Sequence, residues 1–243
     1  FDAVFLGIGA LKPKLLDVPG AGLKGVYQGL PFLAQKNAPI GLDLPPVAVK
    51  GKRVVVLGGG DTAMDCLRTA IRCGAVETLC VYRRDLANMP GSRKEYYNAL
   101  EEGARFMFLT NPLAIEGNTS GEVTAVRCAR MELGEPDASG RRRPRVVPGS
   151  EVTLPADLIL VAYGFDPVPF PPESDLSRIA VNEWGATKTD ANSMTNVAGV
   201  FAGGDVVRGP SLVVHAVRDG RRAAAGIHRY LTEMQPARAS AQP

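Results

Sequence analysis

The stretch RVVVLGGGDTAMD (residues 53–65) joins an apolar strand to a glycine-rich turn and the start of a helix. The turn reads Gly58-x-Gly60-x-x-Ala63, and residues 62–73 have the apolar spacing of a helix. In such a unit the first glycine permits a tight turn, the second admits a pyrophosphate to the backbone, and the small third residue lets the helix pack on the strand. The helix N-terminus favours negative charge. The stretch therefore predicts the phosphate-binding half of a dinucleotide site.

Two arginines follow the next predicted strand. Residues 78–82 form that strand, and Arg83 and Arg84 come directly after it. A site for NAD usually places an acidic residue about 20 residues after the glycines, where it binds the ribose 2′-hydroxyl. Two guanidinium groups suit a 2′-phosphate instead, because they form bidentate, charge-assisted hydrogen bonds. The sequence therefore favours NADPH over NADH. The alternative is a generic glycine turn beside a solvated arginine pair.

Composition excludes several classes of function. The 243 residues suffice for one large or two modest domains, and 45% hydrophobic with 22% charged residues is ordinary for a globular protein. The formal net charge of +3 gives no indication of a nucleic-acid partner. No apolar run approaches the roughly 20 residues that span a bilayer, and no signal peptide is visible. We therefore expect neither a nucleic-acid nor a membrane partner.

The cysteines indicate a reducing compartment. Cys66, Cys73, Cys80 and Cys128 form no CxxC pair, so the sequence predicts neither an iron–sulfur cluster nor a zinc site. Free thiols fit a cytoplasmic protein, and we expect all four to fill the core. We predict no metal site.

Residues 47–154 predict an α/β domain. An alternation of strand and helix indicates a βαβαβ unit with a parallel sheet, its strands at 53–57, 78–82 and 105–109 and its helices at 62–73 and 92–102. A β-meander is expected to follow, with antiparallel strands at 113–116, 122–132 and 145–153. Residues 140–145, GRRRPR, are either an anion patch or, as we favour, a solvated hairpin tip.

The flanking segments contain a second set of signals. Residues 2–9 (DAVFLGIG) resemble residues 157–164 (DLILVAYG), and both are apolar strands ending in glycine, which suggests two related nucleotide-binding halves. Between them, residues 11–31 are expected to be mostly loop, 26–36 a short helix and 39–46 a linker. The chain opens in a strand at Phe1 rather than at Met, so we expect it to be part of a longer protein.

The C-terminal signal is GVFAGGDVV (residues 199–207), a strand running into a glycine turn, followed by a predicted helix at 212–230. Asp205 at this turn suits the hydroxyls of a ribityl chain, although it could instead cap its own backbone. The helix N-terminus can stabilise negative charge developing on a ring. His215 is conceivable as a proton donor to a reduced flavin, but a packing or surface role is favoured.

Together these segments resemble the two-dinucleotide-binding-domain flavoproteins. GVFAGGD resembles the C-terminal FAD motif of that family, and the strands ending in GIGA and AYG resemble its paired junction motifs. Three segments resemble the small (beta) subunits of NADPH-dependent glutamate synthases: LGGGDTAMDCLRTAIRCGA, VYRRDLANMPGSRKE and GPSLVVHAVRDGRRAA. The resemblance covers almost the whole chain, and the spacing between motifs agrees.

The resemblance implies a fold and a domain organisation. A Rossmann-like NADPH-binding domain with a β-meander would occupy residues 45–164. The remainder of a second, FAD-binding Rossmann-like domain would comprise residues 1–44 and 165–243. The cysteine-rich iron–sulfur domain and the first FAD fingerprint of the family are missing from this sequence, as is the CxxC of thioredoxin reductases. We therefore expect the chain by itself to be inactive and free of flavin.

The resemblance also implies roles for individual residues. The NADPH pyrophosphate and its neighbouring ribose would contact Gly58, Gly60, Asp61 and Thr62, although the residues alone suggest that Asp61 caps its helix. The 2′-phosphate would contact Arg83, Arg84 and a third candidate, Arg93. FAD would contact Gly9, Gly204 and Asp205, with the amides near Leu212 and Val213 facing the isoalloxazine. Tyr163 and Gly164 would lie toward the nicotinamide.

The implied activity is hydride transfer from NADPH to FAD. Electrons would then pass through iron–sulfur clusters to the large subunit of glutamate synthase, which makes glutamate from glutamine and 2-oxoglutarate. Hydride transfer between these cofactors needs little acid–base assistance, so we predict no catalytic side chain. The alternatives are the electron-input module of another iron–sulfur oxidoreductase and a nucleotide-binding module without redox chemistry.

Overall fold

The computed structural model describes residues 1–37, 46–136 and 142–239. The chain divides into two compact units. Unit 1 comprises Phe1–Lys14 with Gly164–Pro243, and unit 2 comprises Leu15–Tyr163. The second boundary between the units falls one residue from the one expected near residue 164. The first falls 30 residues before the one expected at residue 44, because residues 15–37 pack with the parallel sheet of unit 2.

Unit 2 contains a five-stranded parallel sheet with the order β3-β11-β4-β5-β6. Its central strand, β4, pairs with β11 on one side and β5 on the other. The strands are β3 (Val26–Gln28), β11 (Leu158–Val161), β4 (Arg53–Leu57), β5 (Glu77–Val81) and β6 (Arg105–Met107). The predicted βαβαβ unit is β4-α2-β5-α3-β6, so the α/β, Rossmann-like fold class is confirmed.

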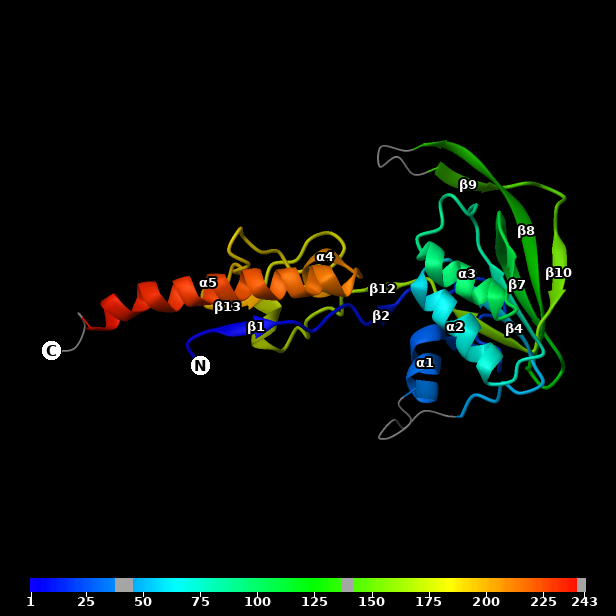
Figure 1. The fold of residues 1–243 in the computed structure, drawn as a ribbon, viewed down its shortest axis with the longest axis horizontal. Helices are drawn as coiled ribbons and strands as arrows, with labels where there is room; N and C mark the ends of the chain where they lie inside the picture. The colour runs from blue at the N-terminus through cyan, green and yellow to red at the C-terminus, as the bar shows by residue number, and fades with distance from the viewer. Residues whose placement is uncertain (38–45, 137–141, 240–243) are drawn as a thin grey trace. The chain divides into compact units, whose positions relative to one another are not determined.

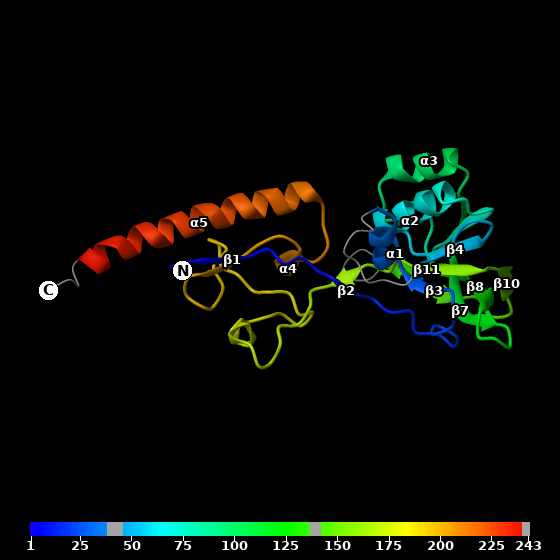
Figure 2. The same ribbon diagram turned by 90° about the horizontal axis from the view of Figure 1, so that it is seen from below.

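The sheet is the middle of three layers (Figures 1 and 2). One face carries α1 (Gly29–Asn37), α2 (Asp61–Arg72) and α3 (Arg93–Glu101), and the other carries the meander of β7 (Thr110–Gly117), β8 (Val123–Pro136) and β10 (Val152–Pro155). Along β4, Val54 and Val56 pack in the core with the helices, whereas Val55 and Leu57 pack in the core with the meander. Burial on both faces explains why residues 54–57 (VVVL) are an unbroken apolar run.

Two expectations for the secondary structure were wrong, and a third was right in part. The helix predicted at 26–36 is present as α1 from residue 29 onward, whereas residues 26–28 form a strand, β3, which extends the sheet beside β11. The predicted strand at 145–153 is two strands, β9 (Arg142–Val146) and β10, which pair with different parts of β8 around a turn containing Gly149 at φ +70°. The supposed hairpin tip at 140–145 belongs largely to β9.

Two other expectations have partial outcomes. The stretch at 11–31 contains a short strand, β2 (Lys12–Pro13), besides β3. The expected linker at 39–46 lies, except for Pro46, outside the described residues, as do residues 140 and 141 of the arginine-rich segment.

Unit 1 is built around two short pairings. A parallel pair joins β1 (Val4–Leu6) to β13 (Val200–Ala202), and an antiparallel pair joins β2 to β12 (Phe165–Asp166). The 3-10 helix η1 (Asp175–Arg178) precedes β13, and α4 (Asp205–Arg208) and α5 (Val213–Ala239) follow it. The core is small and is formed by Leu6, Ile179, Ala202 and Val206. Among the residues described, no helix has the length and apolarity to cross a bilayer.

Candidate functional site

The glycine turn lies where β4 ends, at the carboxyl edge of the parallel sheet. Gly58 has φ +139°, and a Cβ there would lie 2.3 Å from the carbonyl oxygen of Ala162. A Cβ on Gly59 would lie 2.6 Å from the ring of Tyr82. Gly60, in contrast, has no atom within 4 Å of its Cβ position. The turn is therefore closed against the sheet and open at Gly60, which is the arrangement that a pyrophosphate needs to approach the backbone.

The N-terminus of α2 offers unpaired backbone donors to the same space. The helix begins at Asp61, its N-cap is Gly60, and no side chain caps it. The first amides of any helix have no acceptor inside it. Those of Asp61 and Thr62 have no acceptor elsewhere within the described parts of the chain. Free amides at a helix N-terminus suit an anionic phosphate, so these residues fit a pyrophosphate.

Asp61 does not cap its own helix, and that prediction was wrong. Its Oδ1 accepts a hydrogen bond from the backbone N–H of Ser92 at 2.7 Å. Beside it, the N–H of Gly91 donates to the carbonyl of Gly59 at 3.0 Å. The carboxylate thus ties the loop before α3 to the glycine turn.

Replacing Asp61 with alanine is expected to loosen this tie. Losing one charge-assisted hydrogen bond at an exposed site should lower the free energy of unfolding by about 1 kcal/mol. Thermal unfolding of unit 2 measures the effect, and Asp61→Asn is the control because its side-chain oxygen still accepts from Ser92. A loss as large in Asp61→Asn as in Asp61→Ala would contradict this role.

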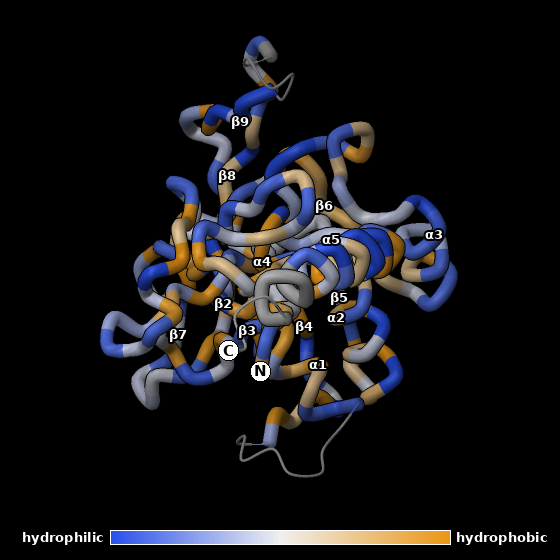
Figure 3. Tube along the Cα trace, turned by 90° about the vertical axis from the view of Figure 1, so that its left-hand side faces the viewer, coloured by the Kyte–Doolittle hydropathy of each residue, from blue (hydrophilic) through white to orange (hydrophobic). Residues whose placement is uncertain are grey.

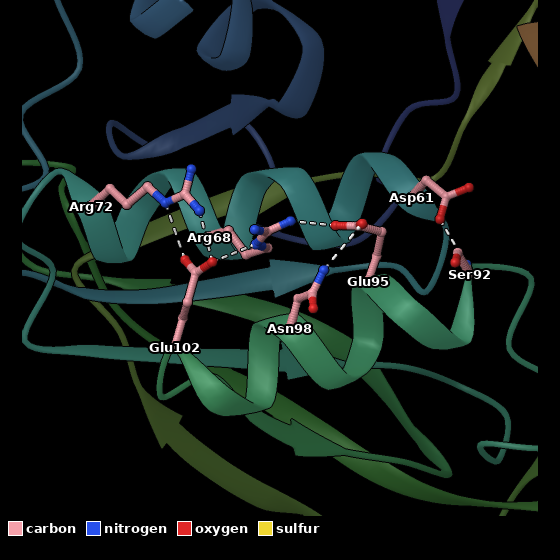
Figure 4. A network of polar contacts seen from close by, with 7 residues as sticks. All are labelled: Asp61, Arg68, Arg72, Ser92, Glu95, Asn98 and Glu102. Atoms are coloured by element: carbon pink, nitrogen blue, oxygen red, sulfur yellow. Dashed lines mark hydrogen bonds and ion pairs between the residues drawn. The ribbon is translucent and has the colours of Figure 1, made fainter.

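Ion pairs hold α2 and α3 together behind the turn (Figure 4). The Arg68 guanidinium pairs with Glu95 and, at 2.8 Å, with Glu102, and Arg72 pairs with Glu102 at 2.7 Å. Hydrogen bonding to Arg72 and Arg68 lowers the pKa of the Glu102 carboxyl. Together with the bond from Ser92 to Asp61, these contacts attach α3 to α2 along its length.

The arginine pair, Arg83 and Arg84, lies beside the glycine turn. Since Leu57 pairs with Val81, the turn and the arginine pair begin at neighbouring positions on one edge of the sheet. Arg83 is exposed and Arg84 is half-buried. Desolvation raises the pKa of Tyr163 to about 12, and the nearby positive charge of Arg83 opposes this shift. Tyr163 lies two residues after the end of β11, at the same edge of the sheet as the glycine turn.

Arg93 and Gly164, the other two residues expected near the nucleotide, belong to different elements. Arg93 begins α3, and its guanidinium donates to the carbonyl of Ala87 at 3.3 Å. Gly164 is the first residue of the second segment of unit 1, has φ +91°, and accepts a hydrogen bond from the N–H of Lys14 at 3.0 Å.

Unit 1 has a pocket of its own, with a volume of about 290 Å³. All five residues expected to contact a flavin line this pocket: Gly9, Gly204, Asp205, Leu212 and Val213. Phe5 and Gly7 of the N-terminal segment line it as well. The pocket is mainly apolar, and the first residues of α5 border it. An apolar wall beside a helix N-terminus fits a flat ring system that gains negative charge.

Two carboxylates beside this pocket have different roles. Asp205 is half-buried, and within the described residues its carboxylate accepts no hydrogen bond, so it remains available to a hydroxyl group. Asp219 on α5 is buried; it pairs with Arg208 through two hydrogen bonds of 2.6 and 2.7 Å and accepts the N–H of Gly204 at 3.2 Å. Asp219 therefore holds the glycine turn and α4 against α5.

Asp219 should make unit 1 sensitive to acid. Hydrogen bonds from Arg208 lower the pKa of Asp219 in the folded state below its unfolded value of about 3.9. Its stabilisation is therefore present above the unfolded pKa and is lost as the pH falls through the folded pKa. Asp219→Asn should cost about 2 kcal/mol at pH 7 and less at pH 3. Hydrogen exchange of the β13 amides at both pH values measures this, and an equal cost at both would contradict it.

His215 lies half-buried on the first turn of α5, with its Nδ1 2.7 Å from the Oγ of Ser211. Ser211 lines the pocket, but the described structure gives His215 no carboxylate partner that would orient it as an acid. Its favoured surface role stays a prediction.

Sequence reasoning missed Gly91, Leu109 and Asp219. The Pro-Gly pair at 90–91 was a signal for Gly91, whose added Cβ would lie 2.9 Å from the carbonyl oxygen of Gly59. Asp219 lies one residue before a glycine on the helix predicted at 212–230, and nothing in that pattern indicates its partner Arg208. Leu109 has an unusual backbone that its residue type argues against.

A parallel sheet with an open glycine turn, free helix amides and an adjoining arginine pair defines an α/β nucleotide-binding protein. Comparison of the sequence with known protein families identifies the family within this class. Residues 1–220 match the pyridine nucleotide-disulphide oxidoreductase family, and the chain belongs to it.

Individual relatives are consistent with this membership. The putative oxidoreductase AegA of Escherichia coli is 48% identical, covering 95% of this chain and 36% of its own length. The NADPH glutamate synthase small chain of Halomonas elongata is 48% identical, covering 95% of this chain and 50% of its own. The chain therefore spans half or less of these relatives. Mycobacterium tuberculosis FprA in complex with NADPH has the same fold, with a TM-score of 0.81 at 20% identity over 98% of this chain and 65% of its own.

Proposed function

We propose that this chain is an NADPH-oxidising flavoprotein module of the glutamate synthase small-subunit type. NADPH binds unit 2, with its pyrophosphate at Gly58, Gly60, Asp61 and Thr62 and its 2′-phosphate at Arg83, Arg84 and Arg93. FAD binds unit 1 at Gly9, Gly204, Asp205, Leu212 and Val213. The observation that carries the proposal is the open space at Gly60 beside the free amides of Asp61 and Thr62, next to an arginine pair on the same sheet edge.

The residues of unit 2 bind and orient the coenzyme. Amides at the start of α2 donate to the pyrophosphate, and the arginine pair supplies the charge that distinguishes NADPH from NADH. Tyr163 and Gly164 adjoin the reduced nicotinamide. No side chain is needed as a base, because the bound cofactors would themselves supply the hydride chemistry.

The residues of unit 1 hold the acceptor. Bound FAD would supply the two-electron chemistry that accepts hydride and passes electrons singly to iron–sulfur clusters. Asp205 accepts a hydrogen bond from a sugar hydroxyl, and the N-terminus of α5 stabilises negative charge on the ring system. Asp219 keeps the glycine turn in place.

The onward path of the electrons completes the proposal. Iron–sulfur clusters and the large subunit of glutamate synthase receive the electrons for glutamate synthesis, as the similarity to the small chain suggests. An equally similar relative is described only as a putative oxidoreductase, which favours a second candidate: the electron-input module of another iron–sulfur oxidoreductase.

The test is reconstitution of the longer protein to which we expect this chain to belong, with FAD and a glutamate synthase large chain. The proposal predicts NADPH oxidation that depends on both glutamine and 2-oxoglutarate. NADPH oxidation with ferricyanide but not with the large chain would favour the second candidate. Tight NADPH binding without any oxidation in the presence of FAD would indicate a binding module and would overturn the redox assignment.

A further inference from the structure

The backbone on both sides of Arg83 is pinned by the corner between β6 and β7. The N–H of Tyr82 donates to Met107 and its carbonyl accepts from Thr110, both at 3.0 Å. The carbonyl of Arg84 accepts from the N–H of Leu109, also at 3.0 Å. The directions in which the arginine side chains leave the backbone therefore depend on the conformation of this corner.

Leu109 holds that corner in a conformation that its side chain disfavours. Its φ is +50°, and only one other non-glycine residue in the described ranges, Ser193, has a positive φ. A bulky residue is an outlier in the left-handed region and persists there only where its surroundings impose it. Here the carbonyl of Leu109 accepts from the N–H of Met131 on β8 at 2.7 Å. Leu109 is thus bonded on one side to Arg84 and on the other to the meander.

The hairpin of β8 and β9 reaches the arginine pair as well. Three of the five residues of β9 are arginines, and the trace around β9 is mostly hydrophilic (Figure 3). The Nε of Arg84 donates to the carbonyl of Arg142 at 3.3 Å. The Arg142 side chain in turn donates to the carbonyls of Gly134 at 2.9 Å and Leu133 at 3.2 Å, which joins β9 to β8 at this point.

We infer that Leu109 is a positioning residue for coenzyme selection: its left-handed backbone, supported by the β8–β9 hairpin, aims the arginine pair at the 2′-phosphate. The meander of unit 2 thereby sets the preference for the phosphorylated coenzyme without touching it. This inference rests on the proposed NADPH site. It concerns a conformational constraint rather than the charge of the pair itself.

The decisive comparison is Leu109→Val against Leu109→Asn. A β-branched residue resists positive φ, whereas asparagine tolerates it. Calorimetric titration of the 243-residue chain should show that Leu109→Val weakens NADPH binding at least about tenfold and leaves NADH binding unchanged. Leu109→Asn should bind NADPH within about twofold of the original chain. Unchanged NADPH binding by Leu109→Val, or equal losses for the two coenzymes, would overturn the inference.

Arg142→Lys provides a second arm if Leu109→Val does not fold. Lysine keeps the positive charge but cannot make the paired contacts to Gly134 and Leu133, so NADPH binding should weaken about threefold. Unchanged binding would mean that the hairpin does not position the arginine pair. Arg84→Ala distinguishes a failure of the proposed NADPH site from a failure of this inference about Leu109. If it weakens NADPH binding while Leu109→Val and Arg142→Lys do not, the NADPH site stands and only this inference fails.

Discussion

Gly58→Ala is expected to destabilise unit 2 by about 3 kcal/mol or more. The reason is twofold, because the residue has φ +139° and a Cβ would lie 2.3 Å from the carbonyl oxygen of Ala162. That oxygen is backbone at the end of β11, so it cannot move aside as a flexible side chain could. Urea-induced unfolding followed by circular dichroism measures the loss.

Gly60→Ala is the matched control for the same turn. Gly60 has φ −90°, and its Cβ position is empty to 4 Å, so the folded chain accommodates alanine. A pyrophosphate needs that space, however, and the affinity for NADPH and for NADH should fall together, at least about tenfold. A stable Gly58→Ala, or a Gly60→Ala that binds both coenzymes normally, would contradict the assigned roles of the turn.

Arg83→Ala should weaken NADPH binding at least about tenfold, with little change in the affinity for NADH. A charge-assisted hydrogen bond is worth roughly 1.5–3 kcal/mol, and only NADPH carries the 2′-phosphate that would receive it. Titration calorimetry with both coenzymes measures the difference.

The control for Arg83→Ala is Arg105→Ala. Arg105 lies at the opposite, amino end of β6, where it pairs with Glu77 at 2.6 Å, so its loss should leave both affinities unchanged. If Arg83→Ala weakened NADPH and NADH binding equally, Arg83 would contact something common to the two coenzymes.

The parallel sheet could be predicted from the sequence because its signals are local. The apolar run of β4, its glycine turn and the amphipathic α2 adjoin one another, so pattern alone indicates a strand–turn–helix unit. The position of β3 could not be predicted in this way. Val26–Gln28 becomes a strand only because β11, far along the chain, offers an open edge. β9 and β10 were merged for a related reason, since each gains its register from β8.

The candidate site likewise has a part that local sequence predicts and a part that it does not. The glycines and the arginine pair belong to a compact motif, and the pocket of unit 1 brings together all five residues that the family resemblance named for FAD. The groups that fix those elements come from distant segments. Ser92 meets Asp61, Arg208 meets Asp219, and Leu109 meets Arg84 through backbone or partly buried contacts that no spacing rule reveals.

A crystal structure of the chain with NADP⁺ tests the central claim most directly. The account predicts the pyrophosphate against Gly60 and the first amides of α2, with the 2′-phosphate within hydrogen-bonding distance of Arg83 or Arg84. An adenosine 2′-phosphate bound away from both arginines would contradict it.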